Sequence, residues 1–297
     1  MVNFSKYQGL GNDFIVIDGL KGDIPDSILN IKPPILKRIC DRNFGIGADG
    51  LIIVCPSTTN CDIRMCIYNS DGTEAEMCGN AVRCVAKYLF EEDLVGQQQL
   101  KIETHIGVLD LDLTVVENRV EQVRVDMGEP ILEAEKIPTM LPGDPVVDQP
   151  LVIPATGHLE EQVLQVTCVS MGNPHCVVFV DHASDEMVHG LGPLIELDAR
   201  FPNRTNVEFV EVLNREQVRQ RTWERGSGET LACGTGASAV CVAGALSGRT
   251  ERRIKNHLLG GDLELEWDED NHVYMTGPAV EVFRGEWMPQ NSTDRVK

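Results

Sequence analysis

The sequence runs through the same series of local patterns twice, and this duplication restricts the fold more than any other feature. Each copy has a glycine-containing turn before an apolar strand, a second strand after a turn, a cysteine before small helix-compatible residues, an alternating strand, and a strand ending at glycine. One such match arises easily by chance, but five in the same order, about 150 residues apart, do not. The paired segments are 9–18 and 171–181, 49–54 and 205–210, 78–89 and 233–245, 107–113 and 261–267, and 123–128 and 273–277.

Two copies of many short strands and one helix predict an α+β fold with two pseudo-symmetric, similar domains. We expect each domain to be a curved, mostly antiparallel sheet around its central helix, with the active site in the interdomain cleft. The chain of 297 residues is long enough for two domains. Residues 130–154 contain six of the 15 prolines, which is typical of a connector between the copies.

Charge and composition argue against several classes of partner. The formal net charge of −20 disfavours binding to nucleic acid or to an anionic membrane. No apolar run approaches the roughly 18 residues that span a bilayer. The first residues, Met1 to Tyr7, lack the basic and apolar regions of a signal peptide, so we expect a cytoplasmic protein.

The ten cysteines are not spaced like a disulfide scaffold or a C-x-x-C zinc site, so no structural metal is expected. Most of them lie in apolar surroundings and are interpreted as buried, inert thiols of a reducing cytoplasm. These are Cys40, Cys55, Cys61, Cys66, Cys84 and Cys241.

A glycine-rich stretch, Gly45 to Gly50, fits the dinucleotide pattern G-x-G-x-x-G. That motif must follow a strand and open a helix. Here an expected helix at 35–40 precedes the glycines and a strand follows them. The sequence therefore argues against a nucleotide site.

Cys78 and Cys233 each precede a run of small residues, so each is expected at the start of a helix. Backbone N–H groups and the positive end of the helix dipole lower a thiol's pKa from about 8.5 toward neutrality. Nine positions separate Asn69 from Cys78, and the same nine separate Glu224 from Cys233. These matched settings suggest that two thiols act on one substrate.

Two such thiols on opposite sides of a ligand suit one reaction well. One, as a thiolate, removes a proton from carbon, and the other, as a thiol, returns a proton to the opposite face. The result is inversion of a stereocentre without a cofactor, with two helix N-termini binding a carboxylate and absorbing the carbanion's charge. The alternative is that both cysteines are small buried residues at tight turns.

Other polar residues near these motifs are candidates for ligand binding. His175 either accepts a proton from a thiol, orients the ligand, or is a loop histidine. Glu224 and Arg225 either clamp a ligand's ammonium and carboxylate groups or form a surface ion pair. Four asparagines at turn-rich junctions either hydrogen-bond a zwitterion or hold left-handed turns. They are Asn12, Asn69, Asn173 and Asn206.

At these residues the chain resembles the diaminopimelate epimerase family, within the cofactor-independent racemase and epimerase superfamily. The resemblance covers essentially the whole chain, and many long motifs in order make it very specific. The motifs are Gly9-Leu10-Gly11-Asn12-Asp13-Phe14, Gly45 to Gly50, Asn69-Ser70-Asp71-Gly72, Glu76-Met77-Cys78-Gly79-Asn80, Ser170-Met171-Gly172-Asn173-Pro174-His175-Cys176, Glu224-Arg225-Gly226 and Ala232-Cys233-Gly234-Thr235-Gly236.

The resemblance implies conversion of LL-2,6-diaminopimelate to the meso isomer in lysine biosynthesis, with no metal and no pyridoxal phosphate. It implies that Cys78 and Cys233 are the acid and base, with His175 near the pair. The reacting carboxylate is expected on the backbone at Gly79-Asn80 and Gly234-Thr235. The implied substrate contacts are Asn12, Asn69, Asn173, Asn206, Glu224 and Arg225. Some relatives carry Gln at the position of Gly50, so no side-chain contact is expected there.

The family fold further implies that the segment from Val280 crosses back to complete the first domain. The expected domains are therefore residues 1–128 with 280–297, and residues 129–279. Domain closure around the substrate is implied, and closure of the empty enzyme would let Cys78 and Cys233 form an inactivating disulfide on oxidation. Dimers are common in the family, so a homodimer is one expected state.

Three alternatives remain at this level. A proline or hydroxyproline racemase of the same superfamily is disfavoured, because the charged pair Glu224-Arg225 suits a distal amino-acid head group. A thiol hydrolase would use Cys233 as nucleophile with His175 as base, but it leaves the second copy unexplained. A non-catalytic amino-acid-binding protein would leave the α-hydrogen unexchanged. The sequence leaves open which thiol is deprotonated at rest and whether the source is bacterial or a plastid.

Overall fold

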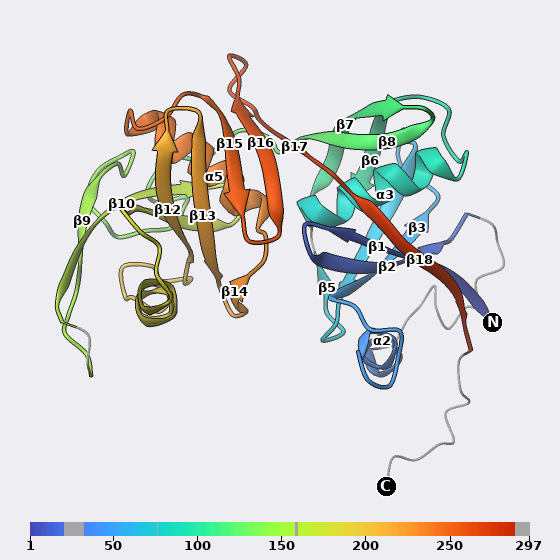
Figure 1. The fold of residues 1–297 in the computed structure, drawn as a ribbon, viewed down its shortest axis with the longest axis horizontal. Helices are drawn as coiled ribbons and strands as arrows, with labels where there is room; N and C mark the ends of the chain where they lie inside the picture. Colours follow the sequence, from blue (N-terminus) through green and yellow to red (C-terminus); the bar gives the residue numbers. More distant parts are fainter. Residues whose placement is uncertain (21–32, 76, 158–159, 289–297) are drawn as a thin grey trace, which may run out of the picture. The chain divides into compact units, whose positions relative to one another are not determined.

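The structure is a computed structural model that describes residues 1–20, 33–75, 77–157 and 160–288. The chain divides into two compact units (Figure 1). Unit 1 comprises Met1–Arg124 together with Pro278–Lys297, and unit 2 comprises Val125–Gly277. No helix among the described residues is long and apolar enough to cross a membrane.

Unit 1 is a mixed sheet with one long helix, α3 (Gly79–Glu91), and a shorter one, α2 (Pro33–Cys40). Strand β1 lies between β18 and β2, antiparallel to both, and β2 continues to β3 in parallel. Strand β4 is antiparallel to β3 and β5 and parallel to β6, and β6 is antiparallel to β7. The strands are β1 (Val2–Gly9), β2 (Asn12–Asp18), β3 (Gly50–Cys55), β4 (Ile63–Asn69), β5 (Glu74–Ala75), β6 (Gln99–Thr104), β7 (Gly107–Val116), β18 (Val280–Trp287) and, running into unit 2, β8 (Arg119–Asp126).

Unit 2 repeats this order of pairing around helix α5 (Gly234–Leu246). Strand β10 lies between β9 and β11, antiparallel to both, and β11 continues to β12 in parallel. Strand β13 is antiparallel to β12 and β14 and parallel to β15, and β15 is antiparallel to β16. The elements are β9 (Gln149–Ile153), β10 (Gln162–Ser170), β11 (Pro174–Phe179), a π-helical turn (Met187–Leu191), α4 (Gly192–Glu196), β12 (Asn206–Asn214), β13 (Gln217–Glu224), β14 (Gly228–Thr230), β15 (Arg253–Leu258), β16 (Gly261–Trp267) and β17 (Val273–Gly277).

The predicted α+β fold with two similar, mostly antiparallel halves is therefore confirmed. The central helix of each half is confirmed too, because α3 packs on β1, β2, β4, β7 and β18, and α5 packs on β10, β11, β12, β15, β16 and β17. The helices differ in surroundings. Helix α5 consists almost wholly of small and apolar residues buried on every side, whereas α3 also carries Lys87 and Glu91 toward its end.

The expectation that residues 130–154 form a connector is wrong. Ile137, Leu141 and Val146 lie in the buried core of unit 2, and the segment ends in β9, which pairs with β10. Apolar residues alternate with the prolines here, and burying them stabilises the folded segment more than leaving it as a linker would. Proline lacks the N–H that a regular strand or helix needs, so the chain stays irregular until β9.

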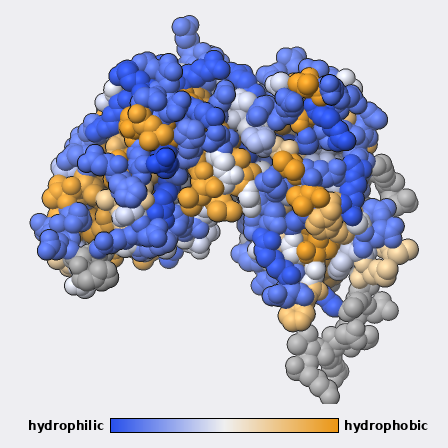
Figure 2. Space-filling view, in the orientation of Figure 1, coloured by the Kyte–Doolittle hydropathy of each residue, from blue (hydrophilic) through white to orange (hydrophobic). Residues whose placement is uncertain are grey.

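Unit 2 exposes apolar side chains at the edge formed by β9 and β10. Val152 and Val163 lie opposite each other in this pair, with 40% and 59% of their surface exposed. Figure 2 shows apolar residues gathered on the surface over these two strands. Single exposed apolar residues of this kind are common on soluble proteins, so the patch assigns no partner by itself.

The interpretation of six cysteines as buried thiols holds for only part of the set. Cys40, Cys84 and Cys241 are buried, but Cys55, Cys61 and Cys66 are half-buried. In β4 the side chains alternate, so Ile63, Met65 and Ile67 are buried on one face, and Cys66 packs partly buried against the core cluster on the other face. A hydrogen bond with the Cys55 thiol lowers the pKa of Cys66 to about 7.

The glycine-rich stretch Gly45 to Gly50 lies between α2 and β3. It follows a helix and precedes a strand, as expected from the sequence. This order is the reverse of the one that a dinucleotide-binding turn requires.

Candidate active site

Both candidate cysteines stand at the N-cap of a 13-residue helix, as the sequence predicts. The backbone of Cys78 is extended, with φ −146° and ψ 117°, and that of Cys233 is similar, with φ −120° and ψ 111°. The first helical bonds run from Val82 N to Cys78 O at 3.0 Å and from Ala237 N to Cys233 O at 2.9 Å. The first turn of a helix presents N–H groups that have no acceptor within the helix, so each cysteine lies beside a place suited to an anion.

In unit 1 the thiol of Cys78 contacts the side chain of Asn12. The Sγ atom lies 3.6 Å from Asn12 Oδ1, and the Asn80 amide donates to the same oxygen at 3.3 Å. The Asn12 amide donates in turn to Asp49 Oδ2 at 2.9 Å. Asp49 therefore fixes which face of the Asn12 amide meets the thiol.

Asp49 belongs to an ion-pair network with Arg42, Asp13 and Lys6. Arg42 donates to Asp13 and Asp49, each at 2.7 Å, and Lys6 lies 2.7 Å from Asp13. Partial burial alone would raise the pKa of Asp13, but the hydrogen bonds from Arg42 and Lys6 bring it well below its ordinary value. This carboxylate consequently stays ionised across the physiological pH range.

Asn69 lies at the end of β4, opposite Gly50 in the register with β3. Its side chain is exposed and donates to Thr73 Oγ1 at 3.0 Å, which closes the turn after the strand. A Cβ at Gly50 would lie 2.7 Å from Tyr68 O, so a larger residue there needs a shift of the backbone. The Asn69 amide therefore bonds within its own turn, at the end of β4.

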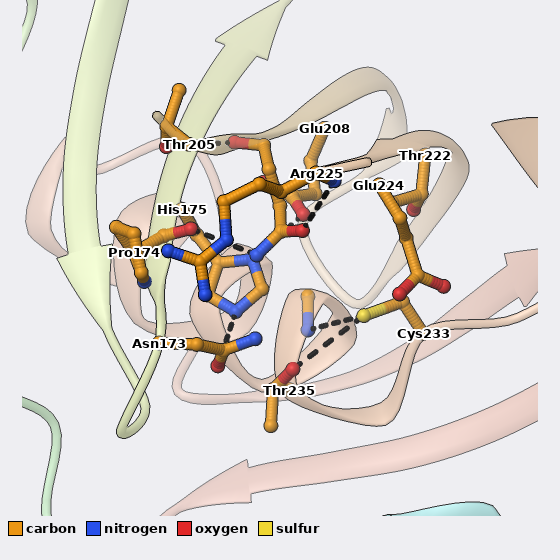
Figure 3. A network of polar contacts seen from close by, with 12 residues as sticks. Asn173, Pro174, His175, Thr205, Glu208, Thr222, Glu224, Arg225, Cys233 and Thr235 are labelled. Carbon is orange, nitrogen blue, oxygen red and sulfur yellow. Dashed lines mark hydrogen bonds and ion pairs between the residues drawn. The ribbon is translucent and has the colours of Figure 1, made fainter. Parts of the chain in front are cut away.

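In unit 2 the thiol of Cys233 is buried at the N-terminus of α5 (Figure 3). It accepts the N–H of Gly236 at 3.4 Å and lies 3.5 Å from Thr235 Oγ1. The prediction of a lowered pKa is wrong for this thiol. Burial, then the carboxylates of Glu224 and Glu208, raise the pKa of Cys233 well above its ordinary value, because they outweigh the helix N-terminus.

His175 is the second residue of β11 and is fully buried, so the interpretation as a loop histidine is wrong. Its Nδ1 lies 2.8 Å from Glu208 Oε1, and its Nε2 lies 3.0 Å from Asn173 Oδ1 (Figure 3). The structure thus joins two of the predicted residues, His175 and Asn173, and adds a carboxylate that the sequence analysis missed. The signal was present, since Glu208 interrupts the apolar run 207–210 and no other residue in that run is charged.

The turn that carries Glu224 and Arg225 is held by two buried side chains. The Asn206 amide donates to Pro174 O and accepts the N–H of Arg225, both at 2.9 Å. Glu196, which the sequence analysis also missed, accepts the N–H of Gly226 at 3.0 Å and the indole N–H of Trp223 at 2.8 Å. Both polar atoms of the Asn206 amide are therefore bonded to the backbone, and they hold the turn that carries Arg225.

Glu224 and Arg225 do not pair with each other. Thr230 Oγ1 donates to Glu224 Oε1 at 2.6 Å, and Arg225 donates to Asn203 O at 3.0 Å. Burial raises the pKa of Glu224. The surface-ion-pair alternative is wrong, because each side chain has a different partner, and Glu224 is the one whose charge acts on Cys233.

Comparison with known proteins identifies the family. The family model described as diaminopimelate epimerase matches residues 4–133 and 167–282. A diaminopimelate epimerase of Moorella thermoacetica is 50% identical over 287 residues, which cover 96% of this chain and 99% of that protein. The chain belongs to the diaminopimelate epimerase family.

The family includes curated relatives from archaea and plants. A diaminopimelate epimerase of Methanococcus maripaludis is 45% identical over 286 residues, covering 96% of this chain and 99% of that protein. A chloroplastic diaminopimelate epimerase of rice is 49% identical over 292 residues, covering 96% of this chain and 79% of that protein.

Solved structures share the fold at much lower identity. A probable proline racemase from Agrobacterium radiobacter superposes with a TM-score of 0.71 at 16% identity, over 99% of this chain and 95% of that one. A hydroxyproline epimerase from Agrobacterium vitis gives a TM-score of 0.66 at 15% identity, over 96% of this chain and 91% of that one. At this identity the likeness shows the fold alone.

Proposed function

We propose that this member of the diaminopimelate epimerase family is an isomerase that interconverts LL-2,6-diaminopimelate and meso-diaminopimelate by two-cysteine acid–base catalysis in lysine biosynthesis. The observation that carries the proposal is the duplicated setting of Cys78 and Cys233, each at the N-cap of the central helix of its half. Membership of the family indicates the substrate. The duplicated geometry supports a mechanism in which one cysteine serves each face of the reacting carbon.

In this mechanism one sulfur, as thiolate, removes the α-proton and the other thiol donates a proton to the opposite face. The carboxylate next to the reacting carbon lies against the helix N-termini at Gly79-Asn80 and Gly234-Thr235, which stabilise the charge of the carbanion. Burial and two neighbouring carboxylates keep Cys233 protonated. Cys233 is therefore the acid of the resting enzyme and Cys78 the base, and the roles exchange for the reverse reaction.

The remaining polar groups bind the rest of the substrate. Glu224 faces an ammonium group and Arg225 a carboxylate of the distal amino-acid end. Asn12, Asn69 and Asn173 hydrogen-bond the zwitterion, and Asn206 supports the Arg225 loop through its two bonds to the backbone. His175 accepts a proton from a thiol of the pair.

The proposal includes the organisation of the whole enzyme. The catalytic domains are residues 1–128 with 280–297 and residues 129–279, with the substrate between them and closure excluding water. No metal or organic cofactor takes part. The enzyme works in the cytoplasm, or in a plastid stroma, and a homodimer is the expected assembly.

A thiol hydrolase with Cys233 as nucleophile and His175 as base is the rival hypothesis. It leaves the matching setting of Cys78, at the N-cap of α3, without a role.

The proposal is tested by incubating the purified chain, with reductant and a chelator but no added cofactor, with LL-diaminopimelate. Chiral chromatography should show the meso isomer accumulating until both isomers are present at equilibrium. Trans-4-hydroxy-L-proline should remain unchanged under the same conditions. Turnover of the proline substrate with none of diaminopimelate would overturn the assignment.

A further inference from the structure

We propose that Glu208 is a positioning residue that acts through His175, by fixing the imidazole and holding it ready to take a proton at Nε2. The proposal rests on the proposed epimerase function, since it names the group that prepares His175 for that reaction. Glu208 lies outside every motif that marks the active site in the sequence.

The geometry joins the two side chains directly. His175 and Glu208 lie on the neighbouring parallel strands β11 and β12, where Glu208 stands opposite Val177 in the register. Both side chains are fully buried, and Nδ1 lies 2.8 Å from Oε1. A carboxylate only accepts hydrogen bonds, so Nδ1 carries the proton and Nε2 is the nitrogen that gains and loses one.

The neighbouring amide suits either state of the ring. Asn173 Oδ1 lies 3.0 Å from Nε2 and accepts its proton when the ring is charged. A half-turn of the amide presents its NH2 group to the neutral ring instead. Both nitrogens of the imidazole therefore have a partner before and after proton transfer.

Glu208 is costly to bury, which argues against a purely structural role. Its Oε2 atom has no hydrogen-bond partner among the described residues and is shielded from solvent. The chain makes room for the carboxylate, because a Cβ at position 236 would lie 2.7 Å from Oε1. A buried carboxylate with one unmatched oxygen destabilises a fold unless a nearby charge offsets it, and the imidazolium of His175 is such a charge.

Other titratable groups face the same space from each neighbouring element. Glu224 approaches from β13 and Cys233 from the N-cap of α5, and the Arg225 guanidinium lies on the turn after β13 (Figure 3). Cys176, the next residue of β11, lies on the other face of the strand, in the hydrophobic core. Glu208 is the member of this group that hydrogen-bonds the ring. Its negative charge favours the imidazolium over the neutral ring.

The step that Glu208 assists is a single proton transfer. In the proposed epimerase the S–H bond of a thiol of the pair breaks, the proton forms an N–H bond at Nε2, and the sulfur keeps the electron pair as a thiolate. The products are a thiolate and an imidazolium, and the carboxylate of Glu208 balances the positive charge at Nδ1.

The test compares Glu208→Gln with a matched control, Glu211→Gln, in the full-length enzyme. Glu211 lies on the same strand, is also buried, and contacts the Nδ1 of His182 at 3.0 Å, but the His182 side chain is 77% exposed. Two quantities are measured for each variant: the pKa of His175 by nitrogen-resolved NMR titration, and the pH profile of kcat/KM for LL-diaminopimelate.

Glu208→Gln should move the NMR titration of His175 to lower pH, because it removes the charge that favours the imidazolium. The acidic limb of the kcat/KM profile should move to lower pH by the same amount, and kcat should fall about 10- to 100-fold with KM within about twofold of wild type. Glu211→Gln should leave the His175 titration and the profile unchanged.

An unchanged His175 titration in Glu208→Gln would overturn the proposal, as would equal loss of activity and thermal stability in both variants. A failure of the proposed function looks different. In that case wild-type protein shows no epimerisation, while the NMR titration still reports whether Glu208 controls His175.

Discussion

The two halves of the molecule build the same backbone around a cysteine but surround it with different chemistry. In unit 1 the groups behind Cys78 form a network at the surface, where Arg42 and Asp49 leave 58% and 43% of their side chains exposed. In unit 2 the groups around Cys233 are His175 and Glu208, both fully buried, and the half-buried Glu224. The repeat therefore preserves the helix, the turn and the cysteine, but not the electrostatic environment.

In the proposed mechanism, this difference assigns different roles to the two thiols of a nearly symmetric scaffold. Two equivalent thiols would have equal affinity for a proton, and neither would be set as acid or base. Buried carboxylates favour the protonated form of Cys233, whereas exposed charges in unit 1 are screened by water and salt. Duplication gives both cysteines the same backbone setting, and burial with two carboxylates raises the pKa of Cys233.

The largest expected effect comes from removing either sulfur. Cys78→Ser and Cys233→Ser should each reduce kcat/KM at least about 100-fold, because a hydroxyl is a far weaker base and acid at neutral pH than a thiol. Steady-state kinetics in both reaction directions measure the effect. A difference in kcat/KM of tenfold or more between the two directions in one variant would show that the two cysteines have different roles. Full activity in either variant would contradict a role for that cysteine.

The raised pKa of Cys233 makes a second prediction with a large effect. Alkylation by iodoacetamide requires the thiolate, so Cys233 in the free enzyme should react slowly at pH 7 and faster as the pH rises above the ordinary thiol range. Glu224→Gln removes one of the charges that raise this pKa, and it should move the alkylation profile to lower pH. Peptide mapping by mass spectrometry follows the site, and fast alkylation of Cys233 at pH 7 would contradict the assignment of the resting acid.

Glu196→Ala tests the buried support of unit 2. It leaves the N–H groups of Trp223 and Gly226 without their acceptor, which should cost about 3 kcal/mol of unfolding free energy. KM should rise as the turn carrying Glu224 and Arg225 loosens. Urea unfolding and kinetics measure both effects, and the exposed Glu135→Ala is the control that should change neither.

Asp49→Ala tests the exposed support of unit 1, where a smaller effect on stability is expected. Exposed ion pairs contribute about 1 kcal/mol or less, so the unfolding free energy should change little. The Asn12 amide loses its acceptor and becomes free to turn away from Cys78, so kcat/KM should fall about tenfold. A stability loss as large as that of Glu196→Ala would remove the contrast between the halves.

The smallest effect is expected at Glu103 in unit 1, far along the chain from either cysteine. Hydrogen bonds from Thr58, and then from Ser57, lower its pKa from 4.5 to about 2. A depressed pKa stabilises the fold above the unfolded value and ceases to do so as the pH falls through the folded value. Glu103→Gln should therefore lower the urea midpoint at pH 7, and the difference from wild type should shrink between pH 4.5 and about 2 while kcat stays unchanged.

The sequence predicted the architecture well because duplication and periodicity are local patterns. Residue spacing predicted that a helix begins at each of Cys78 and Cys233, and it predicted the paired strands. It also argued correctly against a nucleotide loop at Gly45 to Gly50. Burial was predicted less well. The proline-rich segment looked like a linker because its apolar residues have no regular period, and Cys66 looked buried because its strand is apolar on the other face.

The chemistry of the site required three-dimensional contacts. The pKa of Cys233 depends on Glu208, 25 positions earlier, and on Glu224, and the sequence gives no measure of how deeply these carboxylates are buried. Glu196 supports a turn 30 positions away through bonds that no spacing rule predicts. In the sequence such residues appear only as single charged residues among apolar ones, and this pattern does not show which groups they contact.

The central claim is that Cys78 and Cys233 act on opposite faces of one carbon, and solvent-isotope incorporation tests it most directly. LL-diaminopimelate is incubated in D2O with wild-type enzyme and with each Cys→Ser variant, and the α-positions are followed by NMR and mass spectrometry. The account predicts that wild type places one deuterium at the inverted α-carbon and that neither variant inverts it. Meso product formed at the wild-type rate by either single variant would contradict a mechanism that needs both sulfurs.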